Sequence, residues 1–493
     1  MPSTNLILFV LYHVVVILTI VHVLMDNRQP PKTAAWILAI WFVPIAGIVL
    51  YLFFGVNTRK ERMVSQRSLD ELTRRSMLSF VGQQNLQIPQ QHRTLIDLFI
   101  NQSLSLPFKD SAVEVYTDGY QFFPALLKAI ASAKNHIHID IYIFEDDPLG
   151  RLVSDALIAR ARQGVEVRII YDDVGCWRVS HSFFEHMREE GIEVVPFLPV
   201  RFPSFTSKAN YRNHRKLFIV DGSTGFIGGM NIALRYVKGP GKPGTKPTEG
   251  STPWRDTMVR ITGPGVYTLQ RAFLTDWYFV DRTLLSDRRF YPPQPANTVP
   301  GSFAAGGEAS TLIAQTVTSG PDAPYPEIMQ GYVAIVQSAQ SYVYMQTPYF
   351  LPTEPLLFAL KTAASAGIDV RLLVPLKGDN FITDWASRSY LREVAEAGIK
   401  VSLYTPGFLH SKLMVSDDAV TTIGSTNIDF RSFENNFEAN TFFYGQQLAK
   451  HIRHIFLTDQ AQSTPLQDLP HRIRPSFLAR LAESLFRLLA PLM

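Results

Sequence analysis

Two segments of this chain carry the same residues at the same spacing. Each begins with a His-x-Lys pair, followed by an aspartate five residues after the lysine, a glycine seven residues later and an asparagine three residues beyond it. The members are His214, Lys216, Asp221, Gly228 and Asn231 in the first segment, and His410, Lys412, Asp417, Gly424 and Asn427 in the second. Because five residue types recur in register, the pattern indicates an internal duplication.

Each histidine and its lysine are predicted to lie on the same side of a strand. Residues 216–220 and 412–415 are short apolar runs that end at a turn, as strands do. Residues two apart on a strand share a face, so two such pairs brought together surround one anion with two imidazoles and two ammonium groups. A neutral imidazole can attack phosphorus, and a protonated one can donate to the leaving oxygen. With Asn231 and Asn427 as further donors, the pattern predicts phosphoryl transfer at a two-fold site that requires no metal.

With these motifs the chain resembles the phospholipase D superfamily, and within it the bacterial cardiolipin synthases that begin with a membrane hairpin. The resemblance covers nearly the whole chain and includes residues 27–30, 35–38, 213–216, 254–256, 347–350 and the closing Ser-x-x-Arg-Leu-Leu-Ala-Pro-Leu. It implies an α/β fold of duplicated phospholipase D-like domains, each a mixed β-sheet flanked by helices, with a pseudo-two-fold active site between them.

The resemblance also implies roles for the motif residues. One histidine forms a phosphatidyl-histidine intermediate, and the other protonates the leaving group and then activates the acceptor. By this likeness His214 is the nucleophile and His410 the acid/base, with the reverse order left open. An acidic residue after each motif orients a histidine, and Asp256 and Glu438 hold these places. The candidate catalytic residues are His214, Lys216, Asp221, His410, Lys412 and Asp417, and the candidate substrate-binding or orienting residues are Asn231, Asn427, Ser425, Asp256 and Glu438, with no metal ligand.

Two further expectations concern individual motif positions. Asp221 and Asp417, although members of the catalytic motif, are expected to hold the loop after each strand rather than to touch substrate. Gly229 stands where the second copy has Ser425. This difference removes a hydroxyl donor from the first half and predicts that the two halves are unequal.

The composition predicts a membrane protein. The 493 residues suffice for two domains with appendages, and 46% of them are hydrophobic and 12% aromatic, which is rich for a soluble enzyme. Residues 6–25 and 34–54 are two apolar runs, each long enough to span a bilayer. A cleaved signal peptide is the alternative for the first run, but a second apolar run follows at once. We therefore predict an N-terminal two-helix transmembrane hairpin.

Charge predicts how this hairpin is oriented. Residues 59–75 contain six basic and three acidic side chains, which places the catalytic part in the cytoplasm by the positive-inside rule. Arg28 and Lys32, between the two runs, weaken that prediction. The expected location is the bacterial inner membrane, with a multi-pass anchor and cytoplasmic catalytic domains. The single cysteine, Cys176, excludes an intramolecular disulfide and suits a reducing compartment.

The chain is predicted to divide into five parts. They are a transmembrane hairpin (1–58), a connecting region (59–108), two phospholipase D-like domains (109–300 and 308–470) and a C-terminal amphipathic helix (471–493). The second domain repeats the strand and helix order of the first, and residues 162–168 correspond to residues 365–371. The Gly/Ala/Ser-rich residues 301–310 are the expected linker.

Several features allow two interpretations. The basic stretch 238–252 is either a solvated spacer or a lid that attracts anionic headgroups. His136, His138 and Asp140 share one strand face, as a metal site might arrange them or as a buried or subunit-facing polar patch would. The Asp172-Asp173 pair favours a turn or helix cap over a functional loop.

The C-terminal helix allows two interpretations as well. It carries Arg480, Glu483, Ser484 and Arg487 on one face. It either lies in the membrane interface or packs against the catalytic core, since helical periodicity is the same in both cases.

Taken together, these features predict a membrane-anchored phosphatidyltransferase that joins two phosphatidylglycerol molecules into cardiolipin and releases glycerol, without a cofactor. The expected partners are phosphatidylglycerol, cardiolipin and the bilayer, and not nucleic acid, because a net charge of +4 is small for binding a phosphate backbone. A lipid-hydrolysing phospholipase D is the main alternative, and a nuclease or an inactive lipid-binding scaffold is disfavoured by the membrane runs and the intact motifs. The acceptor lipid and the oligomeric state are left open.

Overall fold

The computed structural model describes residues 4–26, 30–55, 88–109, 111–200, 210–239, 251–293, 312–488 and 490. The chain forms two compact units, one of Met1–Met63 with Val200–Tyr211 and one of Val64–Pro199 with Arg212–Met493. The larger unit contains both copies of the motif. The linker predicted at 301–310, residues 59–87 of the predicted connecting region and most of the stretch 238–252 lie outside the described residues.

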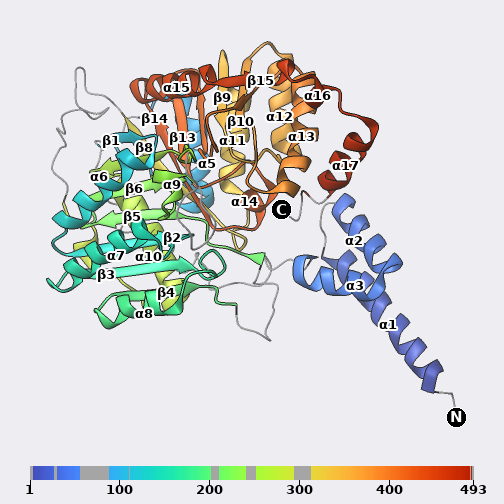
Figure 1. The fold of residues 1–493 in the computed structure, drawn as a ribbon, viewed down its shortest axis with the longest axis horizontal. Coiled ribbons are helices and arrows are strands. Elements are labelled where there is room, and N and C mark those ends of the chain that lie inside the picture. The colour runs from blue at the N-terminus through green and yellow to red at the C-terminus, as the bar shows by residue number, and fades with distance from the viewer. Residues whose placement is uncertain are drawn as a thin grey trace. The chain divides into compact units, whose positions relative to one another are not determined.

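A seven-stranded mixed sheet forms the first half of the larger unit (Figure 1). Its order is β1-β7-β6-β5-β2-β3-β4, in which β2, β3 and β4 run parallel and the other pairs antiparallel. The strands are β1 (Ala112–Tyr116), β2 (His136–Ile141), β3 (Glu166–Asp172), β4 (Glu193–Phe197), β5 (Lys216–Val220), β6 (Thr224–Gly228) and β7 (Met258–Thr262). The helices that accompany them are α6 (Gly119–Ser132), α7 (Pro148–Ala161), α8 (His181–Glu189), α9 (Arg235–Lys238) and α10 (Val266–Asp281).

An eight-stranded sheet of order β15-β11-β10-β9-β12-β13-β14-β8 forms the second half. Its strands are β8 (Ile313–Ser319), β9 (Tyr342–Gln346), β10 (Asp369–Pro375), β11 (Lys400–Tyr404), β12 (Leu413–Ser416), β13 (Val420–Gly424), β14 (Glu438–Tyr444) and β15 (Ser463–Pro465). Its helices are α11 (Glu327–Ser338), α12 (Glu354–Ser365), α13 (Phe381–Glu396), α14 (Phe430–Glu434), α15 (Gln446–Ala461), α16 (Pro470–Ile473) and α17 (Phe477–Leu488). Read from β8, this order repeats the first sheet strand by strand and adds β15 at its edge, so the predicted duplicated α/β architecture is confirmed.

Helix α5 (Gln90–Ser103) lies in the predicted connecting region but packs into the core of the second half. The Phe99 ring contacts the Phe442 ring of β14, with 4.5 Å between the ring centroids. A Cβ on Gly331 of α11 would lie 2.5 Å from the Phe99 side chain, so the glycine admits the ring. The segment that enters the first half is therefore anchored on the second.

The smaller unit contains α1 (Thr4–Met25), α2 (Pro30–Phe42), α3 (Pro44–Leu50) and the π-helical turn η1 (Tyr51–Gly55). The second predicted apolar run is not one helix, because Pro44 starts α3 and has no backbone N–H to continue α2. Within the described part of the chain, none of the helices combines the length and apolar character that crossing a bilayer requires. The structure therefore does not confirm the predicted transmembrane hairpin.

Candidate active site between the two halves

The segment before each motif histidine pairs with the segment before the acid of the opposite half. A parallel bridge joins Asn213 to Phe437, and a second joins Leu409 to Arg255. The His214 N–H donates to the Phe437 carbonyl at 2.9 Å, and the His410 N–H donates to the Arg255 carbonyl at 2.7 Å. The two histidines are thus held by equivalent backbone hydrogen bonds that cross between the halves.

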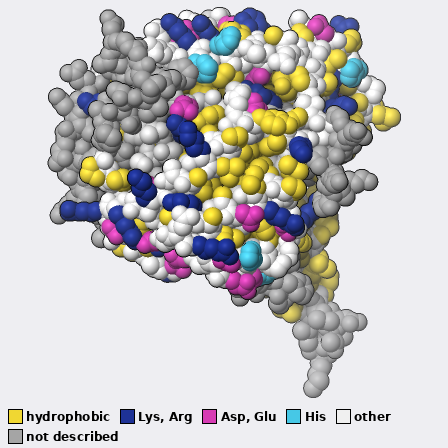
Figure 2. All heavy atoms as spheres, turned by 60° about the vertical axis from the view of Figure 1, so that its left-hand side comes forward, with side chains coloured by type: hydrophobic (Ala, Val, Ile, Leu, Met, Phe, Trp, Pro, Cys, Tyr) yellow, Lys and Arg dark blue, Asp and Glu magenta, His cyan; other side chains and the backbone are white. Residues whose placement is uncertain are grey.

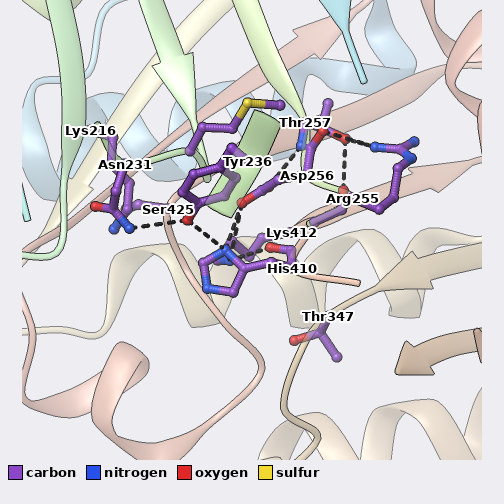
Figure 3. A network of polar contacts seen from close by, with 12 residues as sticks. Lys216, Asn231, Tyr236, Arg255, Asp256, Thr257, Thr347, His410, Lys412 and Ser425 are labelled. Atoms are coloured by element: carbon purple, nitrogen blue, oxygen red, sulfur yellow. Dashed lines mark hydrogen bonds and ion pairs between the residues drawn. The ribbon is translucent and has the colours of Figure 1, made fainter. Parts of the chain in front are cut away.

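The side chains of the two histidines cross in the same way. The Nδ1 atom of His214 lies 2.9 Å and 3.1 Å from the two carboxylate oxygens of Glu438. The Nδ1 atom of His410 lies 2.6 Å from Asp256 Oδ2 (Figure 3). A carboxylate accepts the Nδ1 proton and directs Nε2 away from itself, which fixes the ring and its tautomer. Both predicted acids therefore orient a histidine, and each orients the histidine of the other half.

Both motif lysines are buried beside these histidines. Lys216 donates to the carbonyl of His214 and Lys412 to that of His410, and Lys412 Nζ lies 2.8 Å from His410 Nδ1. The Lys216 ammonium also lies 5.1 Å from the centre of the Tyr142 ring. These contacts hold both ammonium groups close to the histidines, where a phosphate would need them.

Burial weakens the ionised form of all four basic groups. Desolvation lowers the pKa of Lys216 to about 7 and that of Lys412 to about 8. Desolvation likewise lowers the pKa of His214 to about 4 and of His410 to about 3, and the neighbouring lysines act in the same direction. Burial alone would raise the pKa of Glu438, but His214 and Lys216 lower it. An anion bound among these four groups would favour their protonated forms and so raise these pKa values.

The two acids are supported differently in the two halves. The Ser425 hydroxyl donates to Glu438 and accepts the Ala439 N–H at 3.0 Å. The corresponding Gly229 has no room for such a group, because a Cβ there would lie 2.2 Å from Asp256 Oδ1. Thus the Asp256 carboxylate occupies the space that a side chain at residue 229 would take. The halves are unequal at this position, as the sequence predicts.

The two motif asparagines also differ. The Asn231 carbonyl oxygen accepts the Ile143 N–H at 3.0 Å, and its amide donates to the Tyr236 hydroxyl at 3.2 Å. That hydroxyl lies 3.4 Å from His410 Nδ1, so a chain of polar contacts links Asn231 to His410 through Tyr236 (Figure 3). Asn427 is buried, and its side-chain oxygen has no hydrogen-bond partner among the described residues.

Asp221 and Asp417 do not join the two histidines. Each accepts three backbone N–H groups at 2.7–2.9 Å, Asp221 from residues 134–136 and Asp417 from residues 340–342. At roughly 3.3 Å per residue, the five residues of β5 carry the chain about 16 Å from Lys216 to Asp221, away from His214. Their inclusion among the candidate catalytic residues is therefore corrected, because they fasten the loop after each strand to the start of β2 or β9.

Several residues that hold the site together were not predicted. Arg255 pairs with Asp459 of the second half at 2.7 Å and donates to the Asp256 carbonyl at 2.9 Å. Arg215 donates to the Glu438 carbonyl at 3.0 Å and pairs with Asp276. Both arginines lie next to predicted site residues in the sequence. Their partners are distant in the sequence, so the contacts could not be predicted from it. Tyr236 escaped notice because the second copy has Ser432 at that place, so the repeat does not mark it.

The polar face of β2 contacts the segment that leads to His214. Gln270 lies between His136 and His138, at 3.1 Å from His136 Nε2 and 2.8 Å from His138 Nδ1. Asp140 accepts the Asn213 side-chain amide at 2.6 Å. No group of three or more His, Cys, Asp or Glu side chains suited to a metal is found among the described residues. The strand face is thus a buried polar patch whose end holds the residue before His214.

Asp172 completes this support for the loop before His214. Its carboxylate accepts the Asn213 N–H at 2.9 Å and the Gly175 N–H at 2.8 Å. Burial raises the pKa of Asp172 to about 6. The acidic pair therefore includes a turn-capping residue, as predicted, that also positions the segment leading to the site.

Comparisons with known proteins match this architecture. A family model described as "Cardiolipin synthase, PLD-like domain" matches residues 126–239 and 332–460, and one described as "Phospholipase_D-nuclease N-terminal" matches residues 14–55. The chain is 37% identical to a cardiolipin synthase of Geobacillus sp. strain WCH70, over 95% of this chain and 90% of that protein. It is 34% identical to the major cardiolipin synthase of Bacillus subtilis, over the full length of both.

Among solved structures, the phosphatidylserine synthase of Haemophilus influenzae is similar, with a TM-score of 0.60 and 15% sequence identity. The similarity covers 82% of this chain and all of that chain. At this identity it supports the duplicated fold alone.

Proposed function

Because the chain belongs to the family of bacterial cardiolipin synthases with phospholipase D-like domains, we propose that it transfers a phosphatidyl group from one phosphatidylglycerol molecule to another. The products are cardiolipin and glycerol. The observation that carries this proposal is the crossed arrangement of the two histidines, each hydrogen-bonded through Nδ1 to the acid of the opposite half, beside two buried lysines. Such a site offers one nucleophile, one proton donor and two cations to a single phosphodiester.

In the first displacement, neutral His214 attacks the phosphorus of one phosphatidylglycerol through Nε2. The phosphorus–oxygen bond to the terminal glycerol breaks, and protonated His410 gives its proton to the departing oxygen. Glycerol leaves, and His214 carries the phosphatidyl group while its Nδ1 proton stays shared with Glu438. The low pKa of His410 in the empty site requires the anionic phosphodiester, together with Asp256, to favour its protonated form once substrate binds.

The second displacement reverses these roles. Neutral His410 removes the proton from a glycerol hydroxyl of a second phosphatidylglycerol, and the resulting oxygen attacks the phosphorus. The phosphorus–nitrogen bond breaks, cardiolipin forms, and both histidines return to their initial states. Lys216 and Lys412 neutralise the non-bridging oxygens in both steps. Water at the intermediate would give phosphatidic acid instead, so the buried position of both histidines favours transfer over hydrolysis.

Lipid substrates also need apolar surface. Figure 2 shows one face of the protein on which hydrophobic side chains gather over a broad central area, with basic and acidic side chains along its margins. An apolar area of this kind is typical of surfaces that contact lipid or other proteins. It supports a substrate that has acyl chains.

The proposal is tested with the purified full-length protein and phosphatidylglycerol in the presence of EDTA, with lipids and glycerol followed by mass spectrometry. We expect cardiolipin and glycerol in equal amounts, lost in both His214→Ala and His410→Ala. Peptide mapping of the acid-quenched His410→Ala protein should find the phosphatidyl group on His214, and finding it on His410 in the His214→Ala protein would reverse the two roles. Phosphatidic acid as the main product would identify a hydrolase.

The exposed apolar side chains of the N-terminal unit indicate how the protein is held at the membrane. We propose that the N-terminal unit inserts into the bacterial inner membrane as a two-helix hairpin, with the catalytic unit in the cytoplasm. Phe9, Trp41 and Phe42 in α1 and α2 are more than half exposed, which suits contact with lipid. In a Cys176→Ser background, a membrane-impermeant maleimide added to intact cells should label Lys32→Cys and leave Ser180→Cys unlabelled. The opposite labelling would contradict this topology.

A further inference from the structure

The C-terminal helix α17 turns its charged face towards the catalytic unit. Glu483 is only 2% exposed and pairs with Arg392 of α13 at 2.8 Å. The Arg487 guanidinium pairs with Glu393 at 2.7 Å and lies 4.0 Å from the centre of the Tyr390 ring. All of these partners belong to α13. The helix is therefore fixed by its polar side chains together with Phe486, which packs against the core beside Trp385, whereas a helix on a soluble domain usually packs by most of its apolar side.

The apolar side of α17 faces outward as a result. Phe477, Leu478 and Leu488 are each at least 74% exposed, and Leu481 and Leu485 are about half exposed. Phe381, in the first turn of α13, extends this area, is 64% exposed and contacts the Phe486 ring at 5.6 Å between centroids. We call these six side chains, Phe381, Phe477, Leu478, Leu481, Leu485 and Leu488, the α17 face. Figure 1 places α17 at the margin of the second half, beyond α16.

The orientation of α17 cannot be reversed without loss. Turning the leucines inward would break the Glu483–Arg392 pair and leave Arg392, which is also largely buried, without its carboxylate. Breaking one side of a buried ion pair is strongly unfavourable. The α17 face is therefore a stable property of the folded protein, and it needs an apolar environment.

The charge around the α17 face indicates what that environment is. Between residues 470 and 488 the exposed ionisable side chains are His471, Arg474 and Arg480, whereas the one acid, Glu483, is buried. An apolar surface rimmed by basic side chains fits the headgroup region of an anionic bilayer, with leucine and phenylalanine at the acyl boundary and arginine at the phosphates. We propose that α17 lies in the interface of a bilayer rich in anionic phospholipid and holds the catalytic unit against it.

This inference rests on the proposed function only for the identity of the anionic lipid. It also joins the two alternatives that the sequence left open for the C-terminal helix. The polar face of α17 packs on the catalytic core, and its apolar face contacts the bilayer. The catalytic unit would then have a membrane contact of its own, independent of the N-terminal unit.

The test uses full-length protein in vesicles of phosphatidylglycerol and phosphatidylethanolamine. In a Cys176→Ser background, a Leu485→Cys variant carries an environment-sensitive dye, and a doxyl-labelled lipid serves as quencher. The matched control is Leu152→Cys on α7, which is similarly exposed. We expect blue-shifted emission and strong lipid quenching at residue 485, and neither at residue 152. Quenching by aqueous iodide alone would overturn the proposal, and so would a blue shift without lipid quenching, which would indicate contact with a second copy or with the N-terminal unit.

A second variant separates membrane contact from folding. Leu481→Glu with Leu485→Glu, reported by a dye at Leu478→Cys, should lose most of the lipid quenching while the thermal midpoint stays unchanged, since these side chains are exposed. Quenching that survives both glutamates would overturn the proposal. The dye measurements do not depend on turnover. A protein that shows the quenching but makes no cardiolipin in the separate assay would therefore refute the proposed function and leave this inference standing.

Discussion

At the scale of single residues, the site depends on two carboxylates that fix two imidazoles. The repeated motif located the histidines and lysines in the sequence, because the same residue types recur at the same spacing in both halves. The inequality of the halves follows from one missing side chain, because Gly229 leaves the space that the Asp256 carboxylate fills. The two acids differ in length as well, since Asp256 is one methylene shorter than Glu438. Asp256 lies against Gly229, whereas Glu438 accepts a hydrogen bond from Ser425.

This fit predicts unequal losses of activity for two exchanges. Gly229→Ser should displace Asp256 from His410 and lower kcat by about 10²-fold, the scale of a misplaced acid/base. Ser425→Gly should cost less, because Glu438 keeps its contact with His214. Steady-state kinetics on mixed vesicles would measure both. Equal losses in the two variants would show that the clash at residue 229 relaxes freely.

The pH dependence of kcat/KM follows from the free-enzyme pKa values. His214 must be neutral to attack, so activity should fall as pH drops through about 4. Lys216 must be charged to bind the phosphate, and its lowered pKa means that this charge is lost as pH rises through about 7, followed by that of Lys412 near 8. His410 must be protonated in the first displacement, and its pKa of about 3 in the empty site means that kcat/KM should already decline above about pH 4. The decline should steepen as the two lysines lose their charge. A value of kcat/KM that stays constant up to pH 9 would contradict the lowered pKa values of the two lysines.

At the scale of secondary-structure elements, local patterns predicted much and long-range packing did not. The strand expected at 216–220 is β5, with the same bounds. The apolar run 34–54, by contrast, is divided at Pro44, whose effect on a helix outweighs hydrophobicity. Helix α5 could not be assigned to the second half, because its contact with Phe442 crosses more than three hundred residues of chain.

The loops after β5 and β12 give a prediction about stability. Asp221→Ala and Asp417→Ala each remove the acceptor of three backbone N–H groups, and each should lower the free energy of unfolding by about 2 kcal/mol. The histidines should keep their geometry, so kcat of the folded enzyme should stay within about threefold, well below the effect of an acid/base residue. Denaturant unfolding and kinetics measure the two effects, with Asp287→Ala as a surface control. A kcat loss equal to that of His410→Ala would return these aspartates to the catalytic set.

At the scale of the whole catalytic unit, the two halves form one site because they exchange their acids. The sequence identified Asp256 and Glu438 but not which histidine each one orients, since a spacing within one half carries no information about contacts between halves. The crossing is set by backbone pairing, in which each histidine N–H donates to the residue before the opposite acid. The Arg255–Asp459 ion pair adds a further link between the halves.

The exchange predicts which double variants are non-additive. If Asp256 acts only through His410, then Asp256→Asn combined with His410→Ala should be no slower than His410→Ala alone, because residues that work as a pair lose their effect together. Asp256→Asn combined with Glu438→Gln should instead multiply the two single losses, since the carboxylates act on different histidines. Single-turnover formation of the phosphatidyl-enzyme and of cardiolipin would separate the two steps. Non-additivity between Asp256 and His214 instead would mean that the acids act within their own halves, contrary to the crossed hydrogen bonds.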